Sequence, residues 1–175
     1  MLVQTKEPWE FAGKNGVGKS LLGQFQGSEG RRRLIDALIA QPLIRDQDLA
    51  VAVALHLKLE EIAAGATIIE QGASDTDLFL ILEGAVSIAI DGRIAARKNA
   101  GEHVGEMAVV DPGAPRSASA IATCDSIVGR IAERDFSALA DRYPRLWRRI
   151  ALELAQLLRS EYAANHPRGK AEHAA

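Results

Sequence analysis

Short runs of apolar and β-branched residues, separated by turn residues, fill the middle of the chain. They comprise residues 59–62, 67–70, 78–82, 86–90, 93–95, 117–124 and 127–131. Asp91-Gly92 lies between two of these runs and is a strong signal for a two-residue hairpin. Many short strands joined by close turns predict an antiparallel sandwich or barrel with a pocket at its mouth.

Helical periodicity flanks this region on both sides. Residues 31–40 carry one apolar stripe and end before Pro42, and Asp46 is expected to cap a second helix. After the last strand, a short helix over 133–140 precedes a longer one over about 144–163, in which leucines recur at helical spacing. We expect the helices before the barrel to cover one side of a sheet.

The length and composition fit one domain with short appendages. The chain has 175 residues, of which 47% are hydrophobic, and this is enough for one core of ordinary size. We expect an N-terminal extension over 1–30, a folded domain over 31–163 with its barrel at about 57–133, and a linker or tail over 164–175.

The charge balance gives no reason to expect a nucleic-acid partner. A net charge of −2 and a pI near 6.1 create no overall field that would attract DNA. The arginine clusters at 31–33 and at Arg145, Arg148 and Arg149 are expected to be solvated faces of helices. We therefore expect no DNA partner.

The cysteine, histidine and hydropathy patterns argue against a disulfide-bonded, metal-binding or membrane-spanning protein. The single cysteine, Cys124, rules out an intramolecular disulfide, and its run of small and β-branched neighbours predicts a buried strand residue. The four histidines show no metal-ligand spacing, so no metal is expected. No apolar run reaches the roughly 18 residues that a membrane span needs, and we expect a soluble, cytoplasmic protein without a membrane segment.

The stretch from Gly105 to Ala118, GEMAVVDPGAPRSA, carries the candidate chemistry. Gly105 and Glu106 open a short apolar run that can form one helical turn, whose first amide N–H groups suit an anion. Residues 111–113 break the turn and return the chain to Arg116, whose guanidinium can bind the same anion in bidentate fashion. The expected ligand-binding residues are Gly105, Glu106, Met107, Ala108, Arg116, Ser117 and Ala118.

The residue types in this stretch select a particular kind of ligand. A phosphate held by helix-start amides, Arg116 and Ser117 would lie beside Glu106. An ionised carboxylate only accepts hydrogen bonds, so Glu106 suits a ribose 2′-hydroxyl and would repel a second phosphate. The predicted ligand is a 3′,5′-cyclic nucleotide. Taken alone, the segment leaves a second interpretation open, in which Glu106 and Arg116 form a surface ion pair.

This stretch resembles the phosphate-binding cassette of the cyclic-nucleotide-binding domain family, in which Gly-Glu and small apolar residues precede Pro-Arg-Ser/Thr-Ala. The matching residues here are Gly105-Glu106 and 115–118, and Gly72 and Gly84 stand at turns where the family also has glycines. The resemblance implies a catabolite-activator-like sensor domain. The implied fold is α+β and mainly β: an antiparallel β-roll or jelly-roll barrel with N-terminal helices, a short phosphate-cassette helix and a long C-terminal helix.

The resemblance also implies a mode of action. The C-terminal helix would close over the base and pair with its copy in a homodimer, with Arg159 or Tyr162 as candidate lid contacts. Binding would then signal to an effector domain or partner protein. We find no nucleophile with a base, no carboxylate dyad and no cofactor motif that would indicate an enzyme. The cassette binds the part that all cyclic nucleotides share, so cAMP and cUMP both stay open, while Ser117 disfavours cGMP.

The sequence leaves several contexts open. Transcription factors of the catabolite-activator type have a helix-turn-helix after the long helix, whereas a linker-like tail follows here, which disfavours that type. The arrangement resembles Pycsar anti-phage effectors, in which such a domain precedes a TIR domain and answers to cyclic pyrimidine nucleotides. A stand-alone binding protein and the regulatory part of a kinase or channel are the other contexts.

Two alternatives would assign the chain a different role. One is a module of the same fold that has lost its ligand and only dimerises through its C-terminal helix. The other is a P-loop NTPase, because residues 13–20, GKNGVGKS, fit the phosphate-loop pattern. No buried hydrophobic strand precedes that motif and no βαβ series follows it, which disfavours the NTPase.

Overall fold

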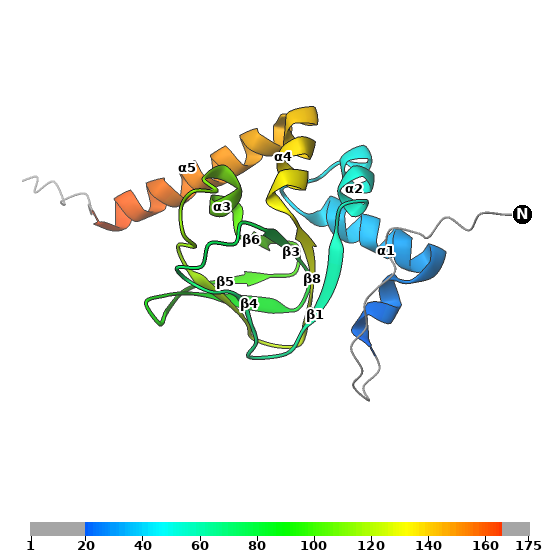
Figure 1. The fold of residues 1–175 in the computed structure, drawn as a ribbon, viewed down its shortest axis with the longest axis horizontal. Coiled ribbons are helices and arrows are strands. Elements are labelled where there is room, and N and C mark those ends of the chain that lie inside the picture. The colour runs from blue at the N-terminus through cyan, green and yellow to red at the C-terminus, as the bar shows by residue number, and fades with distance from the viewer. Residues whose placement is uncertain (1–19, 166–175) are drawn as a thin grey trace, which may run out of the picture.

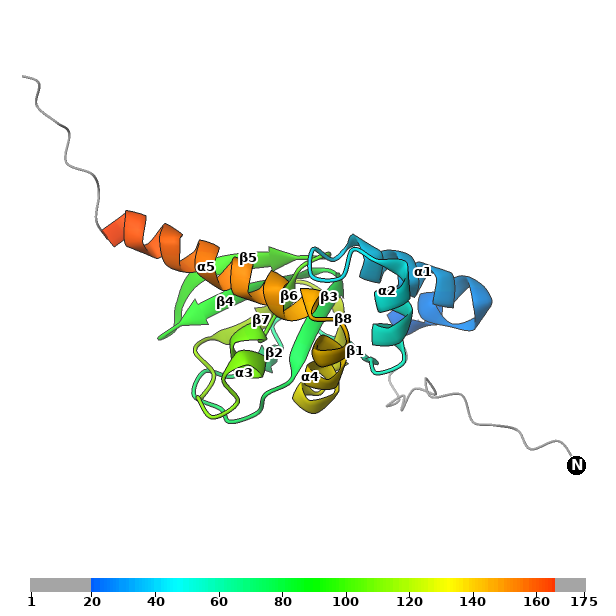
Figure 2. The ribbon, with the colours of Figure 1, turned by 90° about the horizontal axis from the view of Figure 1, so that it is seen from above.

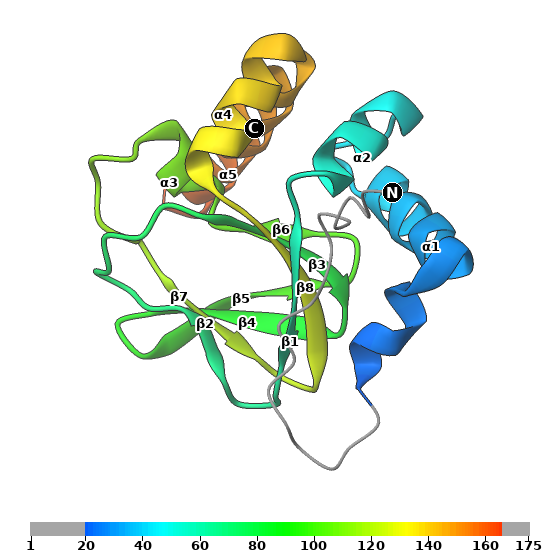
Figure 3. The same cartoon turned by 45° about the vertical axis from the view of Figure 1, so that its right-hand side comes forward.

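The computed structural model describes residues 20–165, which form a barrel of two facing sheets with helices on one side (Figures 1 and 3). Both sheets are four-stranded and antiparallel, with strand orders β1-β8-β3-β6 and β2-β7-β4-β5. The strands are β1 (Lys58–Ile62), β2 (Thr67–Ile69), β3 (Leu78–Glu83), β4 (Ala85–Ile90), β5 (Arg93–Asn99), β6 (His103–Val104), β7 (Ser119–Ala122) and β8 (Ser126–Ile131). The predicted α+β fold with an antiparallel barrel is confirmed.

Strand β3 is apolar from Leu78 to Leu82, where both of its faces are buried. Leu78, Leu80 and Leu82 belong to the core between the first sheet and the helices. Phe79 and Ile81 point to the other side and pack in the interior of the barrel. The rest of that interior consists of Ile69, Val86, Val104, Ala120 and Val128. A continuous apolar run of this length is the pattern expected of a strand covered on two sides.

The helices gather on the outer face of the first sheet and along its upper edge (Figures 2 and 3). They are the 3₁₀ helix η1 (Leu21–Phe25) and the α-helices α1 (Gly27–Ala40), α2 (Gln47–Ala54), α3 (Glu106–Val110), α4 (Glu133–Arg142) and α5 (Arg145–Asn165). Asp46 caps α2 as predicted, since its Oδ1 accepts a hydrogen bond from the Leu49 amide at 2.9 Å. Phe25 of η1 is buried in the same core as α1 and α2.

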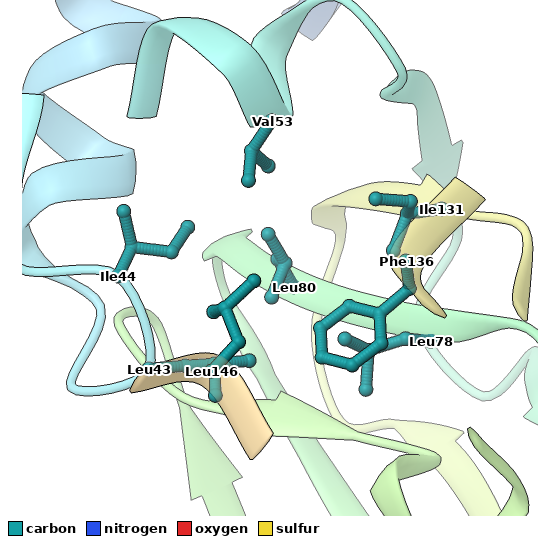
Figure 4. A pocket seen from close by; sticks show the side chains of 8 residues that line it. All are labelled: Leu43, Ile44, Val53, Leu78, Leu80, Ile131, Phe136 and Leu146. Atoms are coloured by element: carbon teal, nitrogen blue, oxygen red, sulfur yellow. The ribbon is translucent and has the colours of Figure 1, made fainter. Parts of the chain in front are cut away.

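A small cavity lies where the helices meet the barrel (Figure 4). Its volume is about 10 Å³ and its lining is entirely apolar: Leu43, Ile44, Val53, Leu78, Leu80, Ile131, Phe136 and Leu146. A water molecule needs about this much room and also two or more polar partners, which this lining does not offer. The cavity is therefore a packing gap beneath α5, far too small for a nucleotide.

Two expectations about single residues are wrong. Cys124 is exposed, because β7 ends at Ala122 and β8 begins at Ser126, which leaves the cysteine in the turn between them. Arg149 is half-buried and donates hydrogen bonds to the carbonyls of the α1–α2 connection, including that of Leu43 at 2.7 Å. The arginines at the start of α5 are thus not simply a solvated face.

Arg145 supports the same correction. Its Nη2 lies 2.8 Å from Oδ1 of Asp46, the residue that caps α2. This contact and the Leu49 amide hold the pKa of the Asp46 carboxyl below its ordinary value, with the amide hydrogen bond as the larger cause. The beginning of α5 is therefore attached to the helices on the N-terminal side of the barrel.

Candidate functional site

The predicted cassette lies where β6 leaves the first sheet and leads into α3. Gly105 joins the two elements with a left-handed φ of 93°, a conformation that side chains with a Cβ rarely adopt. A Cβ built on this glycine would lie 2.8 Å from Nη1 of Arg116 and 2.8 Å from the carbonyl oxygen of Asp77. Glycine is required here because the arginine and the backbone of a second loop approach the turn so closely.

Arg116 is the centre of the site and is only 4% exposed. Its guanidinium pairs with the carboxylate of Asp75 through Nη2 and also through Nε, which lies 3.2 Å from Oδ2. Nη2 donates to the Asp77 carbonyl at 2.7 Å, and Nη1 donates to the Gly105 carbonyl at 3.4 Å. The side chain is thus fixed on the β2–β3 loop and on the first residue of the cassette.

The backbone ties the same two loops together. The Arg116 amide donates to the Ala73 carbonyl at 2.8 Å, and the Gly72 amide donates to the Arg116 carbonyl at 2.8 Å. These paired hydrogen bonds place the guanidinium beneath the cassette before any side-chain contact is considered. Such preorganisation lowers the entropic cost of presenting a buried cation to an anion.

The pairing of Arg116 with Asp75 engages Nε and Nη2 and leaves Nη1 with the weakest contact of the guanidinium. The Asp75 side chain is 44% exposed while that of Arg116 is 3% exposed, so solvent reaches the carboxylate much more readily than the guanidinium. A guanidinium has five N–H donors, and the contact at Nη1 is long. Nη1 is therefore the guanidinium nitrogen with donor capacity to spare, while Asp75 holds the opposite edge.

The sequence pattern did not single out Asp75 and Asp77, which lie between the two matching glycines Gly72 and Gly84. Two carboxylates directly before a fully apolar strand were a usable signal, because they need a cation or solvent at the end of that strand. The Asp77 carboxylate in fact pairs with Arg130 of β8, whose guanidinium lies 6.0 Å from the centre of the Phe79 ring. Asp77 therefore connects the cassette arginine with the first sheet.

The remaining cassette residues surround the same turn. Glu106 is half-buried at the first position of α3, and Ala108 is 6% exposed. The Ser117 hydroxyl lies 3.3 Å from the Met107 sulfur, so the two ends of the cassette touch. The Ala108 amide donates to the Gly105 carbonyl at 3.2 Å. This amide was one of the donors expected to bind an anion, and the turn itself uses it. Ala118 is half-buried just before β7.

The two candidate lid residues lie elsewhere. Arg159 and Tyr162 are exposed on the last turns of α5, which extend beyond the barrel (Figure 2). The structure does not bring them against the cassette, and their role as lid contacts stays a prediction. The phosphate-loop motif at 13–20 lies outside the described residues except for Ser20.

Within residues 20–165 no group of three or more histidine, cysteine, aspartate or glutamate side chains is placed to hold a metal ion. No helix in the described part of the chain is long and apolar enough to cross a membrane.

A jelly-roll barrel with a Gly-Glu turn packed against a buried arginine is the arrangement expected of a sensor domain for a small ligand. Residues 59–143 match the cyclic nucleotide-binding domain family, and this part of the chain is a domain of that family. Domains of this family are regulatory rather than catalytic. The ligand class predicted from the cassette, a cyclic nucleotide, is that of the family.

Comparison with individual proteins agrees with this assignment. The chain is 40% identical over 139 residues to the Pycsar effector protein XpPycTIR of Xanthomonas perforans, covering 79% of this chain and 46% of that protein. The values for the Pycsar effector protein BcPycTIR of Burkholderia cepacia are likewise 40%, 79% and 46%. The chain thus spans about half the length of these relatives. The catabolite activator protein of Thermus thermophilus superposes with a TM-score of 0.65 at 28% identity, covering 71% of this chain and 61% of that one.

Proposed function

We propose that this domain binds one 3′,5′-cyclic nucleoside monophosphate in the cassette and reports its presence through α5. The observation that carries the proposal is the buried guanidinium of Arg116, fixed by Asp75, Asp77 and Gly105 directly beneath a Gly-Glu turn. A buried cation in such a place favours a singly charged anion that can reach it through the cassette.

The proposal assigns each cassette residue one contact. Arg116 binds the exocyclic oxygens of the cyclic phosphate, Ser117 adds a hydroxyl, and the amides of Glu106 and Met107 serve the remaining oxygen. Glu106 accepts a hydrogen bond from the ribose 2′-hydroxyl. Ser117 would exchange its contact with the Met107 sulfur for one with phosphate, a gain since sulfur is a weak acceptor.

Signalling goes through the long helix. Ligand binding shifts the population of α5 toward a closed position, to an extent set by the ligand's preference for that position. Leu157 and Leu158 are 49% and 66% exposed on the outer half of α5, and a homodimer formed through this half would bury them. Arg159 and Tyr162 would act as lid contacts in the closed state.

The relatives give the proposal a context. Because two Pycsar effector proteins are 40% identical to this chain over 139 residues, we propose that it is the sensor part of an anti-phage effector. An effector domain of the TIR type would then carry the response, and cUMP rather than cAMP would be the signal. The alternative with the most support is a ligand-free dimerisation module, favoured by the exposed leucines of α5.

Ligand-dependent stabilisation tests the proposal. A ligand that binds only the folded state at a hundred times its Kd adds about 2.7 kcal/mol of stability, which raises the melting temperature by several degrees. We expect this rise with one of cAMP, cGMP, cUMP and cCMP, and not with the corresponding 5′-monophosphate, whose second charge faces Glu106. If none of the four raises the melting temperature of ligand-free protein, the dimerisation module replaces the sensor.

A further inference from the structure

One polar contact joins the strand that enters the cassette to the long helix. His103 of β6 is 3% exposed, and its Nε2 lies 2.9 Å from Oε2 of Glu153 on α5. The Glu153 side chain is 35% exposed, so the contact is sheltered but solvent reaches its outer edge. A polar imidazole buried this completely requires a partner, and Glu153 is the one that the helix supplies.

The surroundings reinforce this contact. The hydrogen bond from His103 holds the pKa of Glu153 below its usual range, and the positive charge of Lys98 on β5 acts in the same direction more weakly. Lys98 itself pairs with Glu102 at 3.4 Å, in the turn that precedes β6. Glu153 is therefore ionised at neutral pH and lies near one imidazole and one ammonium group, from two strands that are consecutive in the chain and belong to different sheets.

His103 lies close to the cassette along the chain. Only Val104 separates it from Gly105, the glycine against which Arg116 and Asp77 are packed. β6 is two residues long and is held to β3 through the pairs Phe79 with Val104 and Leu80 with His103. A displacement of the cassette is therefore passed directly to the imidazole, because the connecting backbone is extended and short.

The same part of α5 is anchored by apolar packing. Ile150 and Leu146 are 0% and 1% exposed, and both lie in the core beneath the helix. Leu154 still packs partly buried against this core, whereas Leu157 and Leu158 further along are exposed on the part of α5 that extends past the barrel (Figures 1 and 2). Glu153 thus lies within the last packed turn of α5, directly before its projecting part.

We infer that the His103–Glu153 pair is a latch that couples the cassette to α5: it fixes the helix on the barrel and transmits cassette movement to it. The inference rests on the proposed function, because the movement arises when a cyclic nucleotide enters the cassette. It assigns positioning roles to two residues outside the ligand contacts. Loss of the latch leaves the ligand site intact and disconnects α5 from it.

Distances between two spin labels measure this coupling in the full chain. Cys124 is the single cysteine and is exposed in the β7–β8 turn, so it takes one label, and Ser160→Cys on the exposed distal part of α5 takes the other. Pulsed electron paramagnetic resonance then gives the distribution of distances between the label on the barrel and the label on the helix, with and without a saturating cyclic nucleotide. Calorimetry on the same samples reports binding separately.

We expect the nucleotide to shift this distribution in the protein with an intact latch. In Glu153→Ala the distribution without nucleotide should be broader, and the nucleotide-dependent shift should fall below half, while the nucleotide Kd changes by less than about fivefold. Glu153→Gln keeps an acceptor for Nε2–H and should retain most of the shift. Glu161→Ala, which removes an exposed carboxylate from the same helix, should behave as the parent protein.

Each contrary result has a defined meaning. A full shift in Glu153→Ala, or no shift in the parent despite calorimetric binding, overturns the latch and leaves the sensor intact. If Glu153→Gln loses as much of the nucleotide-dependent shift as Glu153→Ala does, the hydrogen bond from His103 is not the origin of the coupling. Absence of calorimetric binding by any cyclic nucleotide refutes the proposed function itself.

Discussion

Replacement of Gly105 by alanine tests whether the close approach at the cassette is essential. The added Cβ would lie 2.8 Å from the Asp77 carbonyl oxygen and 2.8 Å from Nη1 of Arg116. The carbonyl belongs to the backbone of the β2–β3 loop and the guanidinium is buried, so neither can withdraw freely. Gly65→Ala is the matched control, because Gly65 has a similar φ of 82° with no atom within 4 Å of the added Cβ.

The two variants separate backbone strain from steric conflict. A left-handed conformation costs an alanine roughly 1–2 kcal/mol, and this cost is common to both sites. Overpacking adds about 1–3 kcal/mol, which we expect only at Gly105. Gly105→Ala should therefore lose about 1–3 kcal/mol more of the free energy of unfolding than Gly65→Ala does.

Urea unfolding followed by circular dichroism measures this difference, and calorimetric titration of the folded variants measures its effect on the site. Displacement of Arg116 should weaken cyclic-nucleotide binding at least tenfold in Gly105→Ala, whereas Gly65→Ala should bind as the parent protein does. Equal losses of stability in the two variants, or unchanged binding in Gly105→Ala, would refute the packing argument.

Three further predictions concern the ribose contact, the helix core and the latch. Glu106→Ala should weaken binding by about 10- to 100-fold in calorimetry, the value of a hydrogen bond to a charged group, and a 2′-deoxy ligand should then lose nothing further. Leu146→Ala enlarges the existing cavity and should cost about 3–5 kcal/mol in urea unfolding, against about 0.5 kcal/mol or less for Leu55→Ala, which truncates a 51% exposed leucine outside α5. The pKa of Glu153 is lowered in the folded protein, so its ionised carboxylate should make the parent more stable than Glu153→Gln. This difference in the free energy of unfolding should be complete above pH 4.5, the ordinary pKa of glutamate, and should disappear as the pH falls through the lowered pKa of Glu153. The first prediction fails if a 2′-deoxy ligand still binds more weakly than its parent ligand to Glu106→Ala. The second fails if the two leucine variants lose equal unfolding free energy, and the third if the stability difference between the parent and Glu153→Gln does not depend on pH.

Local signals in the sequence were sufficient for most of the fold. Asp91-Gly92 forms the predicted hairpin turn, with φ of 50° and 74°, because two left-handed residues match the twist of the flanking strands. The Asp46 cap and the apolar stripe of α5 were likewise visible, since both depend on neighbours within a few residues. β6 was not predicted, as a strand of two residues has no periodicity to detect.

Contacts between distant segments could not be derived in this way. The sequence singled out Arg116, but its partners Asp75 and Asp77 come from the β2–β3 loop, and their pairing depends on the packing of the two sheets. The prediction that Cys124 is buried was wrong for a related reason. Its small and β-branched neighbours indicated burial, but β7 ends before it and β8 begins after it, which places it in the turn. The latch between His103 and Glu153 needs the position of α5 on the barrel, which no local pattern gives.

The central claim is that Arg116 holds the phosphate of a 3′,5′-cyclic nucleotide, and one calorimetric comparison tests it most directly. The best-binding nucleotide is titrated into the parent protein, into Arg116→Lys, which keeps the charge but loses the bidentate fork, and into Arg32→Ala, which removes an exposed arginine of α1. The account predicts micromolar or tighter binding to the parent and to Arg32→Ala, and at least tenfold weaker binding to a folded Arg116→Lys. Equal affinity for all three proteins would contradict it.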